Sequence, residues 1–312
     1  MIRFFLIIPL ALLFGVIYAQ QDPQISQYMS SSMVYNPGFA GSRDAICLGL
    51  LHREQWVGIP GAPQTSAFFV NMPINPFKIN SGIGLSIVND KIGFEKNVAM
   101  NFTYAYQMDI KNGEGKLGIG VSGGFFNKTM EAKWITPEGD DGTSDNAIPG
   151  QKESAMVFNL GLGLYYRTDK LYLGLSSTNL TQAKFKFSKG APNLTREYYV
   201  TAGYSMALPN NLLELQPSVL IATDGRSSSF DINSILTYNK RIWGGVTYRL
   251  NAAVVGMLGI ELKNGLRIGY SYDYATSAIS NYNSGTHEVM LNYCFNIVKE
   301  KMRRKYKSVR FL

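Results

Sequence analysis

Few side chains in this sequence are spaced for catalysis. The only histidines are His52 and His287, and Ser284 precedes the second of them closely. A serine beside a histidine can act as a nucleophile with its general base. The spacing assigns no carboxylate that would orient the histidine, as such a site requires. The pattern therefore favours polar contacts at a loop or rim, and we expect neither catalytic residues nor an enzyme.

Two further patterns could bind ligands, and both are weak. Residues 138–146 contain four carboxylates, whose oxygens could bind Ca²⁺, but they lack the spacing of an EF-hand, so a solvated acidic loop is the favoured interpretation. The Gly-X-Gly segments at Gly82 and Gly118 are similar to phosphate-binding loops, yet each lies inside a predicted strand with no helix after it. The sequence therefore predicts no metal site and no cofactor.

The elements that must position these residues are strands, as residues 97–110 show. Large apolar residues occupy every second position from Val98 to Ile110, with small or polar residues between them. An extended chain places alternate residues on opposite faces, whereas a helix of this sequence would have no apolar face. The run exceeds the five or six residues usual in soluble sheets, and it suits a strand that crosses a bilayer.

Such alternating runs recur along the chain. Because every backbone group inside a lipid bilayer must be paired, membrane strands close into barrels. We therefore predict an all-β protein: a transmembrane antiparallel β-barrel of the bacterial outer membrane with about 14 strands, a soluble β-sandwich being the alternative. The runs are 45–55, 64–71, 81–89, 96–110, 116–127, 156–167, 171–177, 197–207, 212–223, 229–238, 242–249, 254–262, 266–274 and 286–296.

The predicted connections alternate in length, which is typical of outer-membrane barrels with short periplasmic turns and longer outside loops. An even strand number then places both termini in the periplasm. A connection around residues 72–80 is longer than this scheme expects. The tight turns are 111–115, 168–170, 208–211, 239–241 and 263–265, and the long connections are 129–155, 178–196 and 275–285.

The chain divides into four predicted parts. Residues 1–19 have the charge and apolar run of a secretory signal peptide. Residues 20–44 form an N-terminal plug or periplasmic segment, residues 45–296 the barrel and residues 297–312 a short basic periplasmic tail. A fourteen-strand barrel is too wide for its own side chains to fill, so the polar segment 20–44 suits the lumen, with a flexible leader as the alternative.

The only cysteines are Cys47 and Cys294. They lie in the first and last predicted strands, which become neighbours when a barrel closes, and both fall on the small or polar face. Directly opposed strand residues have Cβ atoms about 4.5 to 5.5 Å apart, and an exported protein reaches an oxidising compartment. We therefore hypothesise a disulfide across the seam, with two buried thiols as the alternative.

A series of short motifs along the sequence resembles the pattern of a known protein family. They read Asp22-Pro-Gln-Ile-Ser-Gln-Tyr-Met29, Asn36-Pro-Gly-Phe-Ala-Gly-Ser42, Arg53-Glu-Gln-Trp-Val-Gly58, Pro60-Gly-Ala-Pro-Gln-Thr65, Asn89-Asp-Lys-Ile-Gly93, Tyr270-Ser-Tyr-Asp-Tyr274 and Ser284-Gly-Thr-His-Glu-Val-Met-Leu291. In this order, from residue 22 to about residue 296, the chain resembles the PorP/SprF family. The residues that carry the resemblance are Asp22, Pro23, Gln27, Tyr28, Asn36, Pro37, Gly41, Gln55, Trp56, Gly61, Pro63, Asp90, Asp273 and His287.

The resemblance implies an outer-membrane component of the type IX secretion system of Bacteroidetes, associated with export of cell-surface proteins and, in gliding species, of adhesins. It implies no enzyme. It also implies periplasmic and lipoprotein partners that link the barrel to peptidoglycan, besides outer-membrane lipid and a secreted adhesin or other cargo. Whether the chain serves the general machine or one adhesin stays open. The alternative function is a plugged outer-membrane transporter or channel for small or hydrophobic solutes.

The predicted tail concentrates the positive charge of the protein. Residues 297–312 carry seven basic residues and one acidic residue, so they supply +6 of the net charge of +8. A periplasmic tail of this kind could dock on an acidic partner, while a solvated tail is the alternative; nucleic acid is excluded by compartment. The predicted partner-binding residues are Lys299, Lys301, Arg303, Arg304, Lys305, Tyr306, Lys307 and Arg310.

Overall fold

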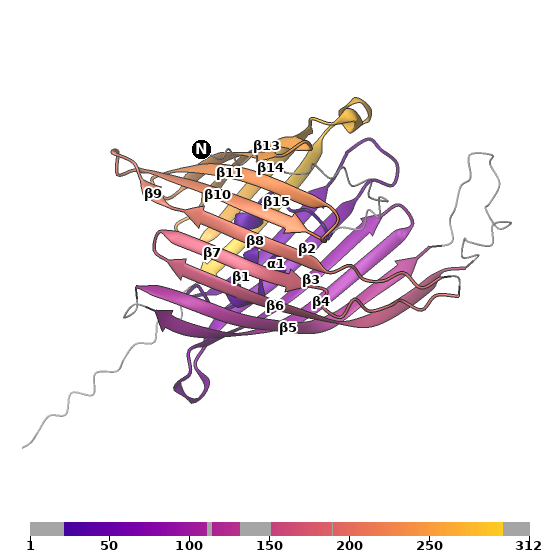
Figure 1. Cartoon of the computed structure of the whole chain (residues 1–312). Helices are drawn as coiled ribbons and strands as arrows, with labels where there is room; N and C mark the ends of the chain where they lie inside the picture. Colours follow the sequence, from indigo (N-terminus) through magenta and orange to yellow (C-terminus); the bar gives the residue numbers. More distant parts are fainter. Residues whose placement is uncertain (1–21, 111–113, 132–150, 189, 296–312) are drawn as a thin grey trace, which may run out of the picture.

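The strands form one closed antiparallel β-barrel (Figure 1). The computed structural model describes residues 22–110, 114–131, 151–188 and 190–295. Strands that follow one another along the chain are paired, and β15 returns to pair with β1. The strands are β1 (Ile46–Glu54), β2 (Gln64–Ile74), β3 (Ser81–Ile92), β4 (Glu95–Ile110), β5 (Gly115–Met130), β6 (Glu153–Thr168), β7 (Leu171–Thr178), β8 (Glu197–Tyr204), β9 (Met206–Ala207), β10 (Leu213–Thr223), β11 (Ser228–Tyr238), β12 (Ile242–Arg249), β13 (Ala253–Glu261), β14 (Leu266–Ala275) and β15 (Thr286–Phe295).

The short strand β9 is a continuation of β8 and does not count as a separate strand of the barrel. Both pair with β10 in the same register, Gly203 opposite Ser218 and Met206 opposite Leu215. The ladder breaks between them at Pro217, which has no backbone N–H to donate. The described strands therefore make a fourteen-stranded barrel, and the predicted fold class is confirmed.

Strand β4 shows why this sequence closes a barrel in lipid. Its side chains alternate between exposed Phe102 and Tyr104 and buried Thr103 and Ala105. The exposed face is apolar and suits lipid, whereas the buried face carries small or polar groups that meet the lumen. The alternation predicted for residues 97–110 therefore places the large side chains outside the barrel.

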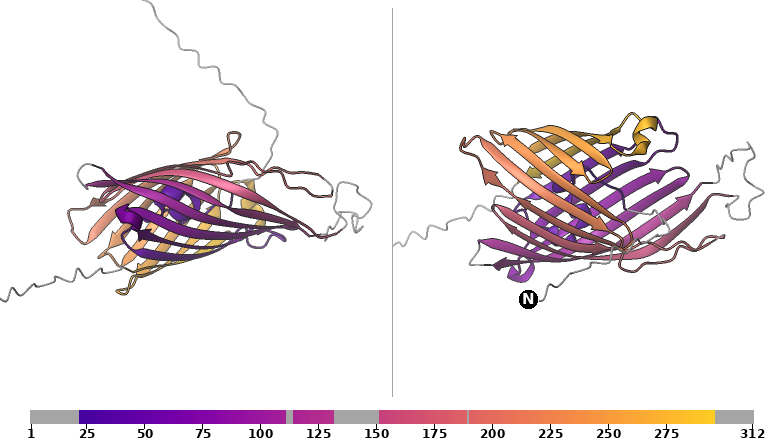
Figure 2. Two further views of the ribbon diagram at one scale, coloured as in Figure 1. Left: turned by 90° about the horizontal axis from the view of Figure 1, so that it is seen from below. Right: turned by 45° about the horizontal axis from the view of Figure 1, so that its top comes forward.

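Short helical turns lie inside the ring of strands (Figure 2). They are η1 (Tyr28–Ser30), α1 (Ser32–Tyr35) and η2 (Pro37–Phe39), while η3 (Pro76–Lys78) and η5 (Ala278–Tyr282) belong to connections between strands. Nothing helical in the described part of the chain has the length and apolar character to cross a membrane.

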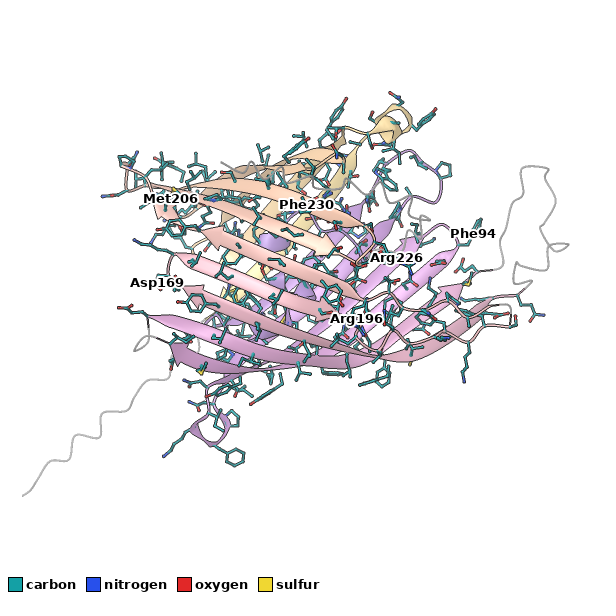
Figure 3. All side chains as sticks on the ribbon, viewed as in Figure 1. Phe94, Asp169, Arg196, Met206, Arg226 and Phe230 are labelled. Atoms are coloured by element: carbon teal, nitrogen blue, oxygen red, sulfur yellow. A yellow bond between two sulfur atoms is a disulfide. The ribbon has the colours of Figure 1, made fainter. Side chains whose placement is uncertain are left out.

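The two ends of the barrel differ in their connections. Figure 3 shows Asp169 and Met206 at one end, here called the turn end, and Phe94 and Arg196 at the other, the loop end. The longest connections, 131–152 and 179–196, are both at the loop end, as predicted. The predicted alternation is incomplete, because 93–94, 224–227 and 250–252 are also tight and lie at the loop end.

Two of these tight loop-end connections use residues that tolerate a left-handed backbone. Gly93 and Asn251 have φ angles of 55° and 57°. Two-residue and similarly tight hairpins require such angles, and glycine and asparagine adopt them most readily. Loop length therefore marks only part of the difference between the ends.

Candidate functional site

Residues 22–44, here called the plug, occupy the barrel lumen, and glycines on the inner wall make room for them. A Cβ atom added at Gly82 would lie 2.1 Å from the carbonyl oxygen of Ala40, and one at Gly120 would lie 2.3 Å from the carbonyl carbon of Pro37. These contacts are closer than any real Cβ makes, so a larger residue would push the plug off the wall. Gly82 and Gly120, from the two Gly-X-Gly segments, are therefore plug contacts.

Polar side chains fix the middle of the plug to the same wall. Asn36 precedes η2, and its Oδ1 accepts a hydrogen bond from the backbone N–H of Gly38 at 2.8 Å. Its Nδ2 donates to the carbonyl oxygen of Leu164 at 2.9 Å. Gln107 of β4 donates from Nε2 to the carbonyl oxygen of Ala40 at 2.6 Å. Buried backbone groups of a short, irregular segment thus find partners on the strands.

A buried carboxylate on β15 holds the start of the plug. Glu288 accepts the backbone N–H groups of Ser26 and Gln27, both at 2.8 Å. The Ser26 hydroxyl donates to Asp273 of β14 at 2.7 Å and accepts from Arg53 Nη1, also at 2.7 Å. Arg53 in turn pairs with Asp273 at 2.8 Å and with Glu288 at 3.3 Å. Ser26 therefore sits at the centre of three strand-borne charges.

Two further charges extend this arrangement along the wall. Arg249 pairs with Asp231 at 2.9 Å and with Asp273 at 3.4 Å. Arg53, Asp231, Arg249, Asp273 and Glu288 are all at most 4% exposed and are here called the inner cluster. Removing one member of a buried ion pair leaves an uncompensated charge, which is strongly destabilising. The inner cluster thus binds the plug to β1, β14 and β15, and Arg249 joins Asp273 to β11 and β12.

Asp22, the first described residue of the plug, is hydrogen-bonded to the opposite wall of the barrel. Its carboxylate accepts hydrogen bonds from Thr178 at 3.2 Å, Asn179 at 3.2 Å and Tyr199 at 3.0 Å. Burial raises the pKa of the Asp22 carboxyl above its ordinary value, and these hydrogen bonds oppose that effect. On the same side, the Tyr28 hydroxyl lies 2.9 Å from Ser218 Oγ. The plug is therefore held from both sides of the lumen.

A cavity of ≈ 180 Å³ remains between the plug and the wall. Acidic groups line it, among them Asp22, Asp90 and Glu197, together with Asn159 and apolar side chains. One oxygen each of Glu197 and Asn159 is buried without a hydrogen-bond partner in the described residues. The lumen is thus filled over its middle but retains a cavity with both polar and apolar walls.

The motif residues of the β1–β2 connection close the loop end around the seam. Gln55 donates its backbone N–H to the carbonyl oxygen of Pro63 at 2.9 Å. Trp56, with a φ of 48°, donates its N–H to Thr286 Oγ1 at 3.0 Å, and Gly61 accepts from the N–H of Gly93 at 2.8 Å. These residues bind neighbouring loops of the chain to one another.

His287 does not reach the lumen. It lies on the outer face of β15, where its Nδ1 is 2.7 Å from the Tyr270 hydroxyl, while its neighbour Glu288 points inward. Ser284 donates its backbone N–H to Val57, and within the described residues no hydrogen bond joins Ser284 to His287. Asp90 of the family motifs accepts from Thr65 Oγ1 at 2.6 Å.

Gly41 and Gln27 have packing roles in the plug. Gly41 adopts a φ of +71° and lies against Gly82, where a side chain would be strained. Gln27 is 1% exposed beside Gly269. Pro23 lies among the residues that line the lumen cavity.

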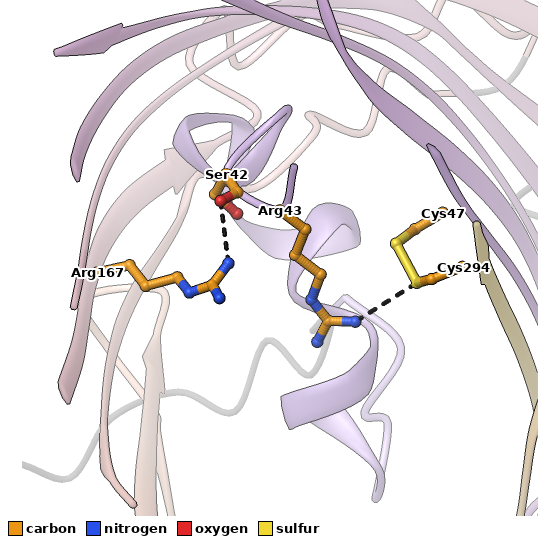
Figure 4. The surroundings of a disulfide bond; sticks show 5 residues. All are labelled: Ser42, Arg43, Cys47, Arg167 and Cys294. Atoms are coloured by element: carbon orange, nitrogen blue, oxygen red, sulfur yellow. Dashed lines mark hydrogen bonds between the residues drawn. A yellow bond between two sulfur atoms is a disulfide. The ribbon is translucent and has the colours of Figure 1, made fainter. Parts of the chain in front are cut away.

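The cysteines meet at the turn end of the seam. Cys47 and Cys294 are directly opposite in the β1–β15 ladder and are joined by a disulfide (Figure 4). Arg43, the plug residue nearest to them in Figure 4, approaches Cys294 Sγ to 3.8 Å. The bond connects the first and last strands of the barrel, 247 residues apart in sequence.

Other predicted sites lie outside the described residues: the signal peptide at 1–19, the acidic loop at 138–146 and the basic tail with all its predicted partner-binding residues. In the part that is described, no group of three or more His, Cys, Asp or Glu side chains could hold a metal ion.

Sequence reasoning missed most of the inner cluster. Arg53 and Glu288 lie within the family motifs, but the sequence alone predicted no role for either of them. Asp231 and Arg249 lie outside all of these motifs. The available signal was a charged residue at an inward position of a membrane strand, because such a charge is costly without a partner. Ser26 carried no signal, since its role depends on where the plug docks.

A closed barrel with an apolar outer face and an ion-paired plug defines the class as an outer-membrane β-barrel. The chain belongs to the PorP/SprF family. The family model described as "Type IX secretion system membrane protein PorP/SprF" matches residues 17–293. No curated protein matches the sequence. The protein is thus an outer-membrane component assigned by family to type IX secretion, and neither family nor fold points to a known class of enzyme.

Solved structures share the barrel architecture at low similarity. The outer membrane protein Omp33 of Acinetobacter baumannii is 8% identical, with 81% of this chain and 98% of that chain covered and a TM-score of 0.45. The toluene transporter TbuX of Ralstonia pickettii is 11% identical, with 86% and 93% covered and a TM-score of 0.46. CymD, a monoaromatic hydrocarbon channel, is 12% identical, with 85% and 91% covered and a TM-score of 0.47.

Proposed function

We propose that this protein is an outer-membrane anchor of the type IX secretion machinery, a scaffold gripped by periplasmic partners rather than an open pore. The observation that carries the proposal is the plug. Glu288 and Asp22 hold it from opposite walls, and inner-wall glycines leave space for its backbone. A lumen occupied by a hydrogen-bonded and ion-paired segment suits a structural role better than free diffusion of solute.

The orientation in this proposal puts the turn end in the periplasm. Ile46 at the start of β1 is paired with Phe295 at the end of β15, so the chain enters and leaves the barrel at the same end. Outer-membrane barrels carry their short turns on the periplasmic side. Both termini, including the basic tail after residue 296, would then face periplasmic components.

The proposal implies three kinds of partner. Outer-membrane lipid meets the exposed apolar face of the strands. Periplasmic and lipoprotein components of the secretion system, including peptidoglycan-binding ones, meet the turn end and the basic tail. A secreted surface adhesin or other cargo is attached or exported through the assembled machinery, whether or not the organism is a gliding member of the Bacteroidetes.

One observation favours a second candidate, a plugged channel for small or hydrophobic solutes. The cavity of ≈ 180 Å³ beside the plug is lined by Val88, Phe126 and Leu194 as well as by polar groups. A solute held there could pass if the plug moved. The alternative therefore requires release of the inner cluster during transport.

Co-purification tests the scaffold. We would tag the full chain and a chain ending at Asn296, solubilise outer membranes gently, and identify bound proteins by mass spectrometry. We expect periplasmic secretion or peptidoglycan-binding proteins with the full chain and their loss from the shortened one. If both arrive alone and the full chain conducts in planar bilayers, the scaffold proposal fails and the channel is favoured.

A further inference from the structure

Three arginines gather at the turn end of the lumen, and none of them forms a salt bridge within the described residues. Arg43 is the next-to-last residue of the plug, Arg167 lies near the end of β6, and Arg267 lies near the start of β14. All three line a cavity of ≈ 370 Å³ together with Lys170 and the exposed Asp169. The same lumen pairs Arg53 and Arg249 with acids.

The contacts of these three arginines orient the guanidinium groups but use only some of their N–H donors. Arg167 donates from Nη1 to the carbonyl oxygen of Ser42 at 2.9 Å. Arg43 lies over the Phe39 ring at 5.6 Å, and Arg267 lies over the Trp243 ring at 4.5 Å. A guanidinium has five N–H donors, and ring stacking uses none of them in a hydrogen bond. Each group is therefore positioned but incompletely neutralised.

The side chains share one space. Figure 4 shows the guanidinium group of Arg167 extending from β6 to Ser42 of the plug and that of Arg43 extending toward the Cys47–Cys294 disulfide. Both side chains line the same cavity. Burial lowers the pKa of the Arg43 guanidinium, and the nearby Arg167 charge acts in the same direction. Of the carboxylates near this mouth, Asp44, Asp169 and Glu261 are exposed, and the half-buried Glu214 accepts hydrogen bonds from Ser205 and Gln216, not from an arginine. Positive charge is thus in excess inside the mouth.

The same cavity has a buried donor without a partner. Arg267 Nε is buried and has no hydrogen-bond partner among the described residues, whereas the Tyr172 hydroxyl interacts with Ser218. All three residues line the cavity. Buried donors without partners are uncommon in folded proteins, and a ligand is one way to satisfy them.

We propose that this mouth is a binding site for the carboxylates of an acidic peptide segment presented by a partner protein. Arginine forks match carboxylates and phosphates alike in bidentate hydrogen bonds. Two features favour the peptide. The arginines point into the lumen and away from lipid headgroups. The cavity also joins its charges to Met29, Phe39 and Leu171, apolar side chains that a free phosphate would not use.

This inference deepens the proposed function, because it gives the chemistry that a periplasmic partner would present. Its test does not depend on the partner. A short peptide can bind the site even if co-purification finds no secretion component, and partners can be found by the tail even if the peptide does not bind.

The test measures binding of a fluorescein-labelled hexaglutamate peptide to the full chain in detergent by fluorescence anisotropy. Arg43→Gln and Arg167→Gln each remove one charged fork and are expected to weaken binding about tenfold or more, as loss of a charge-assisted hydrogen bond does. Arg241→Gln is the matched control, because Arg241 is exposed in the turn between β11 and β12 and does not line the cavity. We expect it to change binding less than about twofold, since exposed charges contribute little.

Other outcomes would overturn the proposal. Equal weakening by all three variants means that the peptide binds diffuse surface charge or the tail. Binding of inorganic phosphate without binding of the peptide means that the site takes a small anion. Arg43→Lys checks folding and geometry together: it keeps the charge but loses the fork, so binding between that of the native protein and that of Arg43→Gln is expected. A variant is compared only if it keeps the native, heat-modifiable electrophoretic band.

Discussion

Replacing Arg53 with glutamine tests whether the inner cluster holds the plug in the lumen. The Arg53 side chain is 1% exposed, and it contacts Asp273 at 2.8 Å, Glu288 at 3.3 Å and Ser26 at 2.7 Å. Glutamine is of similar polarity but carries no charge. In the variant, Asp273 keeps the Ser26 hydroxyl and the more distant Arg249, at 3.4 Å, and Glu288 keeps the plug N–H groups but has no ion-pair partner among the described residues.

The expected magnitude follows from burial. Removing one partner of a buried ion pair costs about 3–5 kcal/mol, because the other charge stays desolvated. If this cost falls on the equilibrium between a plug bound in the lumen and a plug released from it, the fraction of molecules with a released plug rises roughly a hundred- to several-thousand-fold. Each 1.4 kcal/mol changes an equilibrium constant tenfold. The matched control is Lys116→Gln. Lys116 pairs with Asp44 at 2.7 Å, but the two side chains are 33% and 78% exposed, so its loss should cost about 1 kcal/mol or less.

The assay is conductance of the purified full chain in planar lipid bilayers, with the unfolding temperature of the heat-modifiable band measured in parallel. Arg53→Gln should open measurable current and unfold at a lower temperature, while Lys116→Gln should behave as the native protein does. The reasoning is refuted if Arg53→Gln remains closed and unfolds with the control. If Arg53→Gln does not fold, Ser26→Ala removes the plug side of the same contacts and leaves every strand charge in place.

Two other changes probe the plug wall and the seam. Gly120→Ala should lower the free energy of unfolding by about 1–3 kcal/mol through overpacking against Pro37. Gly256→Ala is the control, because an added Cβ there meets nothing within 4 Å, and it should change the free energy of unfolding by less than about 0.5 kcal/mol. Equal effects of the two variants in urea titrations would contradict the plug contact. Non-reducing peptide mapping should recover Cys47 and Cys294 as one linked pair, and two free thiols would rule the bond out. In the chain-entropy model, a cross-link over 247 residues contributes at most about 5.5 kcal/mol, so Cys47→Ser should unfold more easily than the native protein only under oxidising conditions.

Alternation was enough to predict the barrel. The sequence alone predicts that Phe102 and Tyr104 lie on the lipid face of their strand and Thr103 on the lumen face, because a strand has a period of two and lipid accepts only apolar side chains. The family followed from motifs in order along the chain, and its model matches residues 17–293. The division into signal peptide, plug, barrel and tail remains a prediction, and so do the roles given to the tail residues.

Motif membership was a poor guide to position. His287 was singled out and faces outward to Tyr270, while Glu288 beside it binds the plug backbone. A shift of one residue along a strand exchanges lumen for lipid, so assigning a role requires the register and not the motif alone. Likewise, the sequence placed the glycine at position 120 in a strand, but only the structure shows Pro37 of the plug packed against it.

The sequence by itself determined the architecture, since hydrophobic period, strand length and closure depend on local pattern and on the bilayer. Only the tertiary structure decided what fills the barrel. Ser26 meets Asp273 and Glu288 across more than 200 positions of the chain, and Arg43 comes into the same mouth as Arg167 and Arg267. Such contacts arise from the shear and width of the closed barrel, which set which inward side chains face one another and which no local spacing encodes.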